Sequence, residues 1–169
     1  PKRTIVFIGF AGEEFGLLGA QAWVKAHKDK LPKIANLFNR DGGPEPPVGI
    51  SVPQAMYDDF VKISEPIQKI RPDYPFEVKV REPRKRPTRM GGTDASVFAI
   101  EGVPTLGFTT EDFKGYDFDY GEIWHTERDL YTKNIPEYQE HTATVTAIIA
   151  LGVANLDKQL SREGLYTEE

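Results

Sequence analysis

Five residues in the sequence carry side chains that could do acid–base or metal chemistry. These side chains are Glu13, Glu14, Asp41, Asp94 and His125. Glu13 and Glu14 follow the first of three apolar runs, 4–10, and Asp41 follows the second, 34–39. Asp94 and His125 lie in the loops around the third run, 102–108. In an open α/β sheet, ligands bind at the carboxyl ends of the strands, so these side chains could meet at one edge. Carboxylates and an imidazole, without thiolates, form a donor set that zinc accepts.

Each of these residues also has a structural interpretation. Adjacent acids such as Glu13 and Glu14 are favoured at the start of a helix, where the helix dipole stabilises negative charge. Asp41 precedes two glycines and suits a turn, and Asp94 suits the N-cap of a helix. His125 stands in an irregular aromatic segment, where a structural role and a ligand role are equally open.

The apolar periodicity predicts one α/β domain over residues 1–169, with a mixed, largely parallel central sheet flanked by helices. Strands are expected at 4–10, 34–39, 49–52, 76–80 and 102–108. Helices are expected at 15–30, 54–70, 95–100 and 135–156. The run 4–10 is apolar on both alternating faces, which is typical of a strand buried on both sides, and the runs flanking the first helix predict a parallel βαβ unit.

Smaller expectations follow from single residues. Pro66 should kink or divide its helix. His27 and His141 fall in predicted helices, and we assign them to solvent or to packing. The long segment 109–129 is crowded with aromatic and acidic residues and is expected to be functional. The loop 81–89 is rich in arginine and proline, and it is either a solvated turn or a contact for an acidic ligand or another part of the protein.

Composition excludes several classes of protein. With 39% hydrophobic and 28% charged residues the chain is expected to fold, and a net charge of −5 gives no reason to expect a nucleic-acid or membrane partner. The absence of cysteine excludes disulfides, thiolate zinc sites and a cysteine nucleophile. There is no Gly-x-Ser-x-Gly turn of a serine hydrolase and no apolar stretch long enough for a membrane helix.

The order of the motifs is more specific than any one of them. The stretch 3–20, which contains Gly12-Glu13-Glu14, resembles the signature of the co-catalytic di-zinc exopeptidases of the bacterial leucyl aminopeptidase and carboxypeptidase Q type. Further pieces follow in the order that family uses: 38–43, 92–94, 102–104 and 124–129. The resemblance extends from about Lys2 to about Asp157 and implies the three-layer sandwich of that family.

The resemblance implies a role for each chemical residue. Glu13 would be the general base, Glu14 and His125 would bind one zinc ion, and Asp41 would bind a second. The implied activity is metal-dependent hydrolysis of peptide substrates, as an aminopeptidase, carboxypeptidase or dipeptidase. Relatives of this type imply a secreted or periplasmic location.

Four further residues have weaker implied roles. Asp129 would orient the imidazole of His125 without binding the metal itself, and Asp94 would lie near the substrate end of the site. Trp124 stands where some relatives carry a tyrosine whose phenol would assist the oxyanion. Tyr120 is the residue that would substitute for that tyrosine here.

The chain departs from the family pattern in one respect. One more histidine ligand and a bridging aspartate lie upstream of the Glu-Glu motif in that family, and neither His27 nor His141 can replace that histidine. We therefore expect the C-terminal portion of a larger zinc exopeptidase, which alone binds metal poorly and hydrolyses little. An open first strand would favour pairing with absent strands or with a second copy of the chain, giving a homodimer.

Two other functions remain open from the residues alone. A metal-free carboxylate hydrolase would use Glu13 and Asp41 as its acid and base, and its activity would survive chelators. A non-catalytic binding or interaction domain on the same scaffold would bind no metal.

Overall fold

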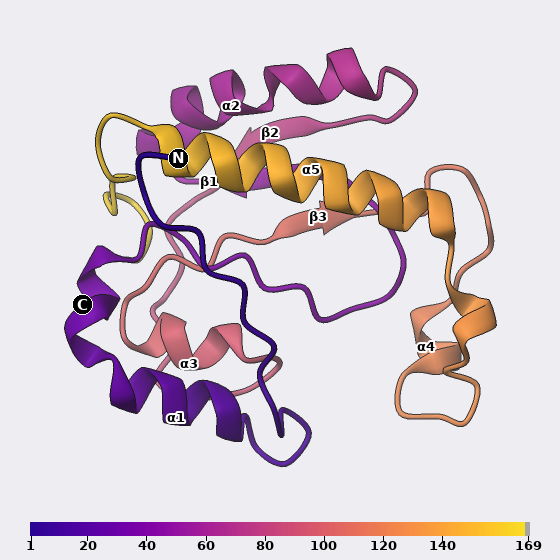
Figure 1. Ribbon diagram of the computed structural model, residues 1–169, viewed down its shortest axis with the longest axis horizontal. Coiled ribbons are helices and arrows are strands. Elements are labelled where there is room, and N and C mark those ends of the chain that lie inside the picture. The colour runs from indigo at the N-terminus through magenta and orange to yellow at the C-terminus, as the bar shows by residue number, and fades with distance from the viewer. Residues whose placement is uncertain (168–169) are drawn as a thin grey trace.

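A three-stranded mixed sheet in the order β2-β1-β3 lies at the centre of the computed structural model, which describes residues 1–167 (Figure 1). β1 (Pro47–Val52) pairs in parallel with β2 (Glu77–Val80) and antiparallel with β3 (Phe108–Thr110). The parallel pair needs a crossover connection, which α2 (Tyr57–Ile70) supplies. The expected mixed sheet with flanking helices is therefore confirmed.

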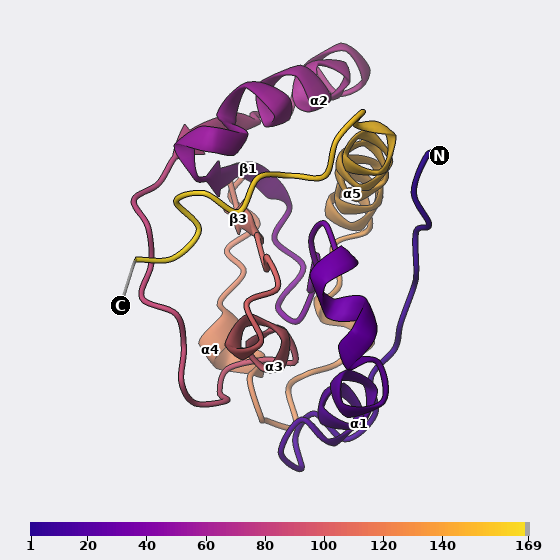
Figure 2. The ribbon, with the colours of Figure 1, turned by 90° about the vertical axis from the view of Figure 1, so that its left-hand side faces the viewer.

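The helices form two groups. α2 packs against α5 (Pro136–Asn155) on one face of the sheet, whereas α1 (Leu18–Ala26) packs against α3 (Ala95–Ile100) at the other end of the molecule (Figures 1 and 2). The one-turn helix α4 (Tyr120–Ile123) lies apart from both groups in Figure 1. Short 3-10 helices cover Lys28–Lys33, Gln54–Met56 and Tyr131–Lys133.

Each helix group has its own apolar cluster. The larger cluster joins the sheet to α2 and α5 through buried side chains such as Ile50, Phe60 and Ile149. The smaller one joins α1 to α3 through Leu17 and Phe98, among others. Because Leu17 of the smaller cluster closely follows the Glu-Glu motif in the chain, its packing fixes where that motif stands.

The expected strand at 4–10 is wrong. This segment is extended but forms no strand, with Val6 65% and Phe7 92% exposed. A strand requires a neighbour to satisfy its backbone groups, and no strand of residues 1–167 lies beside it. The apolar pattern alone could not reveal whether that neighbour was present.

The segment 34–39 is likewise not a strand, so the expected βαβ unit around the first helix is not formed. The Asn36 side chain instead pairs with the backbone of Leu106, donating to its carbonyl at 3.2 Å and accepting from its N–H at 2.8 Å. The Leu37 N–H also donates to the carbonyl of Pro104 at 2.9 Å. These contacts tie the segment to the chain before β3.

Other element boundaries shift for local reasons. The first helix begins three residues late because Gly16 and Leu17 adopt positive φ angles, of 101° and 61°. The strand expected at 102–108 is displaced to β3. Pro66 does not divide α2: it is exposed, so water can satisfy the backbone carbonyl that loses its partner.

The contact between α2 and α5 depends on a glycine. A Cβ atom at Gly152 would overlap the side chain of Ile63. We expect Gly152→Ala to destabilise the fold by about 1–2 kcal/mol, because overpacking outweighs the better helix propensity of alanine. Urea denaturation measures this change. In an Ile63→Ala background the same substitution should cost nothing or stabilise, and an equal cost in both backgrounds would show that the two residues do not compete for space.

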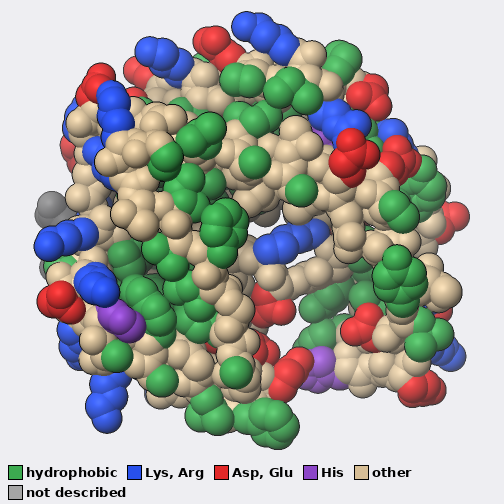
Figure 3. Space-filling model, viewed as in Figure 1, with side chains coloured by type: hydrophobic (Ala, Val, Ile, Leu, Met, Phe, Trp, Pro, Cys, Tyr) green, Lys and Arg blue, Asp and Glu red, His purple; other side chains and the backbone are tan. Residues whose placement is uncertain are grey.

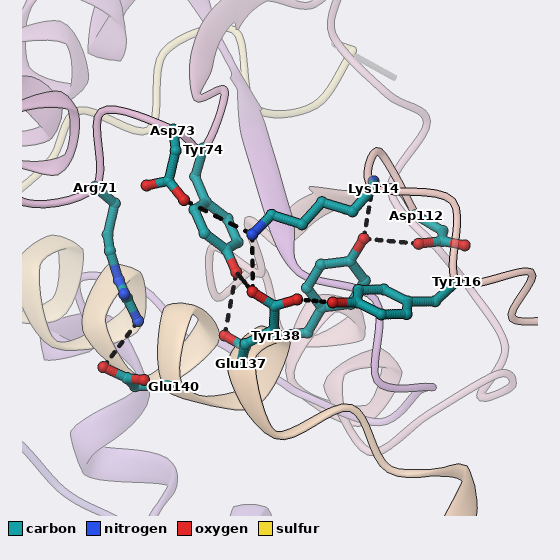
Figure 4. A network of polar contacts seen from close by, with 9 residues as sticks. All are labelled: Arg71, Asp73, Tyr74, Asp112, Lys114, Tyr116, Glu137, Tyr138 and Glu140. Atoms are coloured by element: carbon teal, nitrogen blue, oxygen red, sulfur yellow. Dashed lines mark hydrogen bonds and ion pairs between the residues drawn. The ribbon is translucent and has the colours of Figure 1, made fainter.

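A polar network ties the segment before α4 to the start of α5 (Figure 4). The carboxylate of Glu137 accepts hydrogen bonds from Lys114 Nζ at 2.8 Å and Tyr74 Oη at 3.1 Å. Tyr138 Oη donates to Asp112 at 2.7 Å and accepts from the Lys114 N–H at 2.9 Å. The bond from Lys114 holds the pKa of Glu137 below its usual range.

His141 is fully buried in α5 and stacks on the Tyr74 ring with 3.9 Å between centroids. Its Nε2 donates to the carbonyl of Pro47 at 3.1 Å, whereas its Nδ1 has no partner in residues 1–167. Burial is the main cause that lowers the pKa of His141. The hydrogen bond to the Pro47 carbonyl is the second largest effect and raises the pKa, whereas the charge of Arg71 lowers it.

This burial predicts a pH-dependent stability. The core accommodates the neutral form of His141 but not the charged form. Burial of this side chain therefore stabilises the fold fully above the unfolded-state pKa near 6.5, and the stabilisation is lost as the pH falls below that value. We expect the free energy of unfolding to fall between pH 7.5 and 5 more steeply in the wild type than in His141→Gln. Urea denaturation across this range tests it, and parallel curves for the two proteins would contradict it.

Candidate functional site

A tight turn presents Glu13 and Glu14 at the surface. Gly12 has a φ of 70°, a conformation that glycine adopts without strain. The carbonyl of Glu13 accepts hydrogen bonds from the N–H groups of Gly16 at 2.9 Å and Leu17 at 2.8 Å. These bonds close the turn and leave both carboxylates outside it, with Glu13 half-buried and Glu14 exposed.

Glu14 and His125 meet although 111 residues separate them in the chain. The distance from His125 Nε2 to Glu14 Oε1 is 3.1 Å, and both side chains are more than half exposed. Two ligands of one tetrahedral zinc ion, bound at about 2.0–2.1 Å, stand about 3.3 Å apart. The pair therefore has the separation that two ligands of one ion require. The φ of 57° at His125 is the left-handed conformation, uncommon for a residue other than glycine.

The other predicted residues gather around Glu13. Its partial burial is the largest cause that raises its pKa, followed by the negative charges of Asp41, Glu14 and Asp94, whereas His125 lowers it. The charges of these four residues all act on Glu13, so the five residues selected from the sequence lie in one region of the molecule. A carboxylate with a raised pKa is suited to accept a proton near neutral pH.

Asp94 is the most buried acid of the site, at 7% exposure. Asp94 occupies the N-cap position of α3, as expected, but its side chain caps no N–H, and Thr93 Oγ1 accepts from the Ala95 N–H instead. Asp94 Oδ1 is buried and has no hydrogen-bond partner in residues 1–167. Burial, and then the charge of Asp41, raise its pKa. An unpaired buried carboxylate oxygen is costly, which indicates a site suited to a cation or another donor.

A cleft of about 530 Å³ adjoins these acids. Asp41, Thr93, Phe118 and Tyr120 are among the residues that line it. The Phe118 ring lies so close to Gly43 that any side chain there would collide with it. Figure 3 shows this face of the molecule hollowed, with acidic side chains and a histidine at the rim. The lining of the cleft thus includes both acids and aromatic rings.

The polar network holds the aromatic side of the cleft. Asp112 Oδ2 accepts from the Phe118 N–H at 3.4 Å, while its other oxygen accepts from Tyr138. The sequence could not single out Phe118 among the aromatic residues of 109–129, because its role depends on a contact with Gly43 far away in the chain. Thr93, which accepts from Asn39 Nδ2 at 2.8 Å, was missed for the same reason.

The weaker candidates have different positions. The Trp124 ring lies tilted against His125, with 4.7 Å between centroids, and Tyr120 lines the cleft. Asp129 is exposed, and no hydrogen bond within residues 1–167 joins it to His125, so its orienting role stays a prediction. His27 stacks on Trp23 at 4.4 Å, a packing role like the one expected from the sequence.

The donor types fit zinc, but the described part of the chain does not complete a site. In residues 1–167 no group of three or more His, Asp or Glu side chains is close enough to hold an ion. Catalytic zinc usually has three protein ligands. Glu14 and His125 form one close pair of such donors, and Asp41 lines the adjoining cleft.

Comparisons with known proteins show the family of the chain. The sequence profile of Peptidase family M28 matches residues 1–149, and the chain belongs to that family. Carboxypeptidase Q of Mus musculus is 24% identical over 96% of this chain and 32% of its own length. A probable zinc metalloprotease of Phaeosphaeria nodorum is 49% identical over 41 residues, which are 24% of this chain and 8% of that protein.

Solved structures show the same fold. A Peptidase M28 precursor from Shewanella amazonensis matches with a TM-score of 0.65 and 24% identity, over 90% of this chain and 31% of that one. An aminopeptidase from Aneurinibacillus sp. strain AM-1 matches with a TM-score of 0.51 and 16% identity, over 91% of this chain and 34% of that one. The chain thus spans about a third of the length of these relatives.

Proposed function

We propose that the chain is the C-terminal portion of a zinc metallopeptidase that hydrolyses a terminal peptide bond. The observation that carries this proposal is the 3.1 Å approach of His125 to Glu14 beside Glu13. Membership of Peptidase family M28 supports it, as do relatives named carboxypeptidase, aminopeptidase and zinc metalloprotease.

Each residue has a role in this proposal. Zinc held by Glu14 and His125, and a second ion held by Asp41, would supply Lewis acidity to a water molecule and to the scissile carbonyl. Glu13 takes the proton of that water and delivers it to the leaving amine, as its raised pKa permits. Tyr120 and Phe118 form the wall against which a substrate side chain packs.

The remaining ligands, a histidine and a bridging aspartate by the family resemblance, would come from chain outside residues 1–169. The short coverage of the relatives supports this, and so does the unpaired backbone of 4–10, which suits a neighbouring strand. We call a protein that joins residues 1–169 to those ligands the complete peptidase. The chain alone would bind zinc weakly, and its open segment would favour a homodimer.

Location is a part of the proposal that rests on the family resemblance. We propose that the complete peptidase is periplasmic or secreted. No helix within residues 1–167 is long and apolar enough to span a membrane.

Peptide hydrolysis by the complete peptidase tests the function. We expect release of a terminal residue from unmodified dipeptides or short peptides, loss of this activity after chelation, and recovery on adding zinc. Substrates blocked at the N-terminus or at the C-terminus identify which end is recognised. Activity that survives chelation and His125→Ala would favour a metal-free carboxylate hydrolase, and absence of both metal and activity would favour a binding domain.

A further inference from the structure

A second cleft lies away from the acidic site. Its volume is about 500 Å³, and it lies between the connection from β2 to α3, the segment before β3 and the C-terminal segment. Figure 2 shows that connection running along the same side of the molecule as the C-terminal segment. The residues that line the cleft and carry polar side chains are Ser51, Arg81, Arg84, Lys85, Thr105, Thr109 and Tyr166.

Three of these side chains are cationic and none is acidic. Arg81, Arg84 and Lys85 form no ion pair with a carboxylate in residues 1–167. The Arg81 guanidinium donates only to backbone carbonyls, those of Glu82 at 3.0 Å and Leu165 at 3.4 Å. Burial and the neighbouring charge of Arg84 lower the pKa of Arg81. The cleft therefore gathers positive charges that repel one another.

This cluster is unusual for the chain as a whole. The net charge is −5, so carboxylates are plentiful, yet none within residues 1–167 neutralises these three cations. Arginine side chains offer a planar fork of donors that matches the oxygens of phosphate and carboxylate groups. Hydroxyl groups of Ser51 and Thr109 add neutral donors on the sheet side of the cleft.

We propose that this basic cleft is a second ligand site, which binds an oxyanion group, phosphate or carboxylate, of a small molecule. The site is distinct from the peptidase site, since Glu13, Glu14, Asp41 and His125 do not line it. Both clefts share the wall 105–108, of which Thr105, Gly107 and Phe108 line each of them. The proposal does not depend on the peptidase function.

Calorimetric titration with inorganic phosphate and, separately, with succinate tests the site, with sodium chloride holding the ionic strength constant. We expect saturable binding of at least one of the two, with one ion per chain. Arg84→Gln and Lys85→Gln should each weaken it about fivefold or more, because each removes a charge-assisted hydrogen bond. Tighter binding of phosphate identifies a phosphorylated ligand, and tighter binding of succinate identifies a carboxylate ligand.

The chain offers a matched control. Arg89→Gln also removes one positive charge from the connection between β2 and α3. Because Arg89 does not line the cleft, the affinity of this variant for the ion should equal that of the wild type. Arg84→Gln should fold normally, because Arg84 bonds to Leu165 and Thr167 through its backbone. No saturable binding of either ion would overturn the proposal. An equal loss of affinity in Arg89→Gln would also overturn the proposal, because binding would then depend on the overall positive charge and not on the cleft.

Discussion

Glu13→Gln is expected to lower kcat of the complete peptidase by a factor of about 10²–10⁴, the range that a general base contributes. Glutamine is nearly the same size but cannot accept the proton of the attacking water. Glu13 is not one of the proposed zinc ligands, so the zinc content of the variant should equal that of the wild type. Steady-state kinetics together with metal analysis of the same samples measures both quantities.

A matched control separates this effect from the loss of any surface charge. Glu65→Gln makes the same chemical change on the exposed side of α2, far from the site in sequence and in fold, and should leave kcat unchanged. If Glu13→Gln kept its kcat within a few-fold of the wild type, Glu13 would not be the base. A joint loss of zinc and activity would instead make it a ligand.

Glu14→Ala and His125→Ala should each weaken zinc binding by the complete peptidase by at least about 100-fold, because structural zinc sites gain roughly 3 kcal/mol from each of four ligands. The two residues approach to 3.1 Å and would share one ion, so the loss in the double variant should exceed either single loss and should differ from their sum. Competition with a zinc-binding dye measures these affinities.

His27→Ala is the control for the loss of a histidine. His27 stacks on Trp23 and takes no part in the acidic site, so its removal should leave zinc affinity unchanged. Wild-type affinity in His125→Ala would refute the assignment of that ligand. Equal losses in His27→Ala and His125→Ala would show that the histidines act through folding.

Local patterns were sufficient for three of the helices, but not for α4 or for the bounds of α1. The spacing of apolar residues predicted α3 at its observed bounds, and α2 and α5 to within a few residues, because a helix satisfies its own backbone. The runs 4–10 and 34–39 have an equally strong strand pattern, yet neither pairs within residues 1–167. A strand depends on a partner that its own residues do not specify, so its prediction from one run was less secure.

The functional site was likewise predicted only in part. The Glu-Glu motif and the histidine motif predicted the residues that meet, because the family resemblance carries information on tertiary position. The burial of Asp94 and the contact of Phe118 with Gly43 were beyond local patterns. Each depends on how α3 and the segment before α4 approach the turn at 41–43, which only the folded chain shows.

The most direct test of the account is a crystal structure of the complete peptidase with anomalous diffraction at the zinc edge. The account predicts two zinc ions about 3.5–4 Å apart, one bound by Glu14 and His125 and the other by Asp41, with Glu13 beside them and bound to neither. Zinc bound elsewhere, or an acidic site that stays free of metal in the active enzyme, would contradict it.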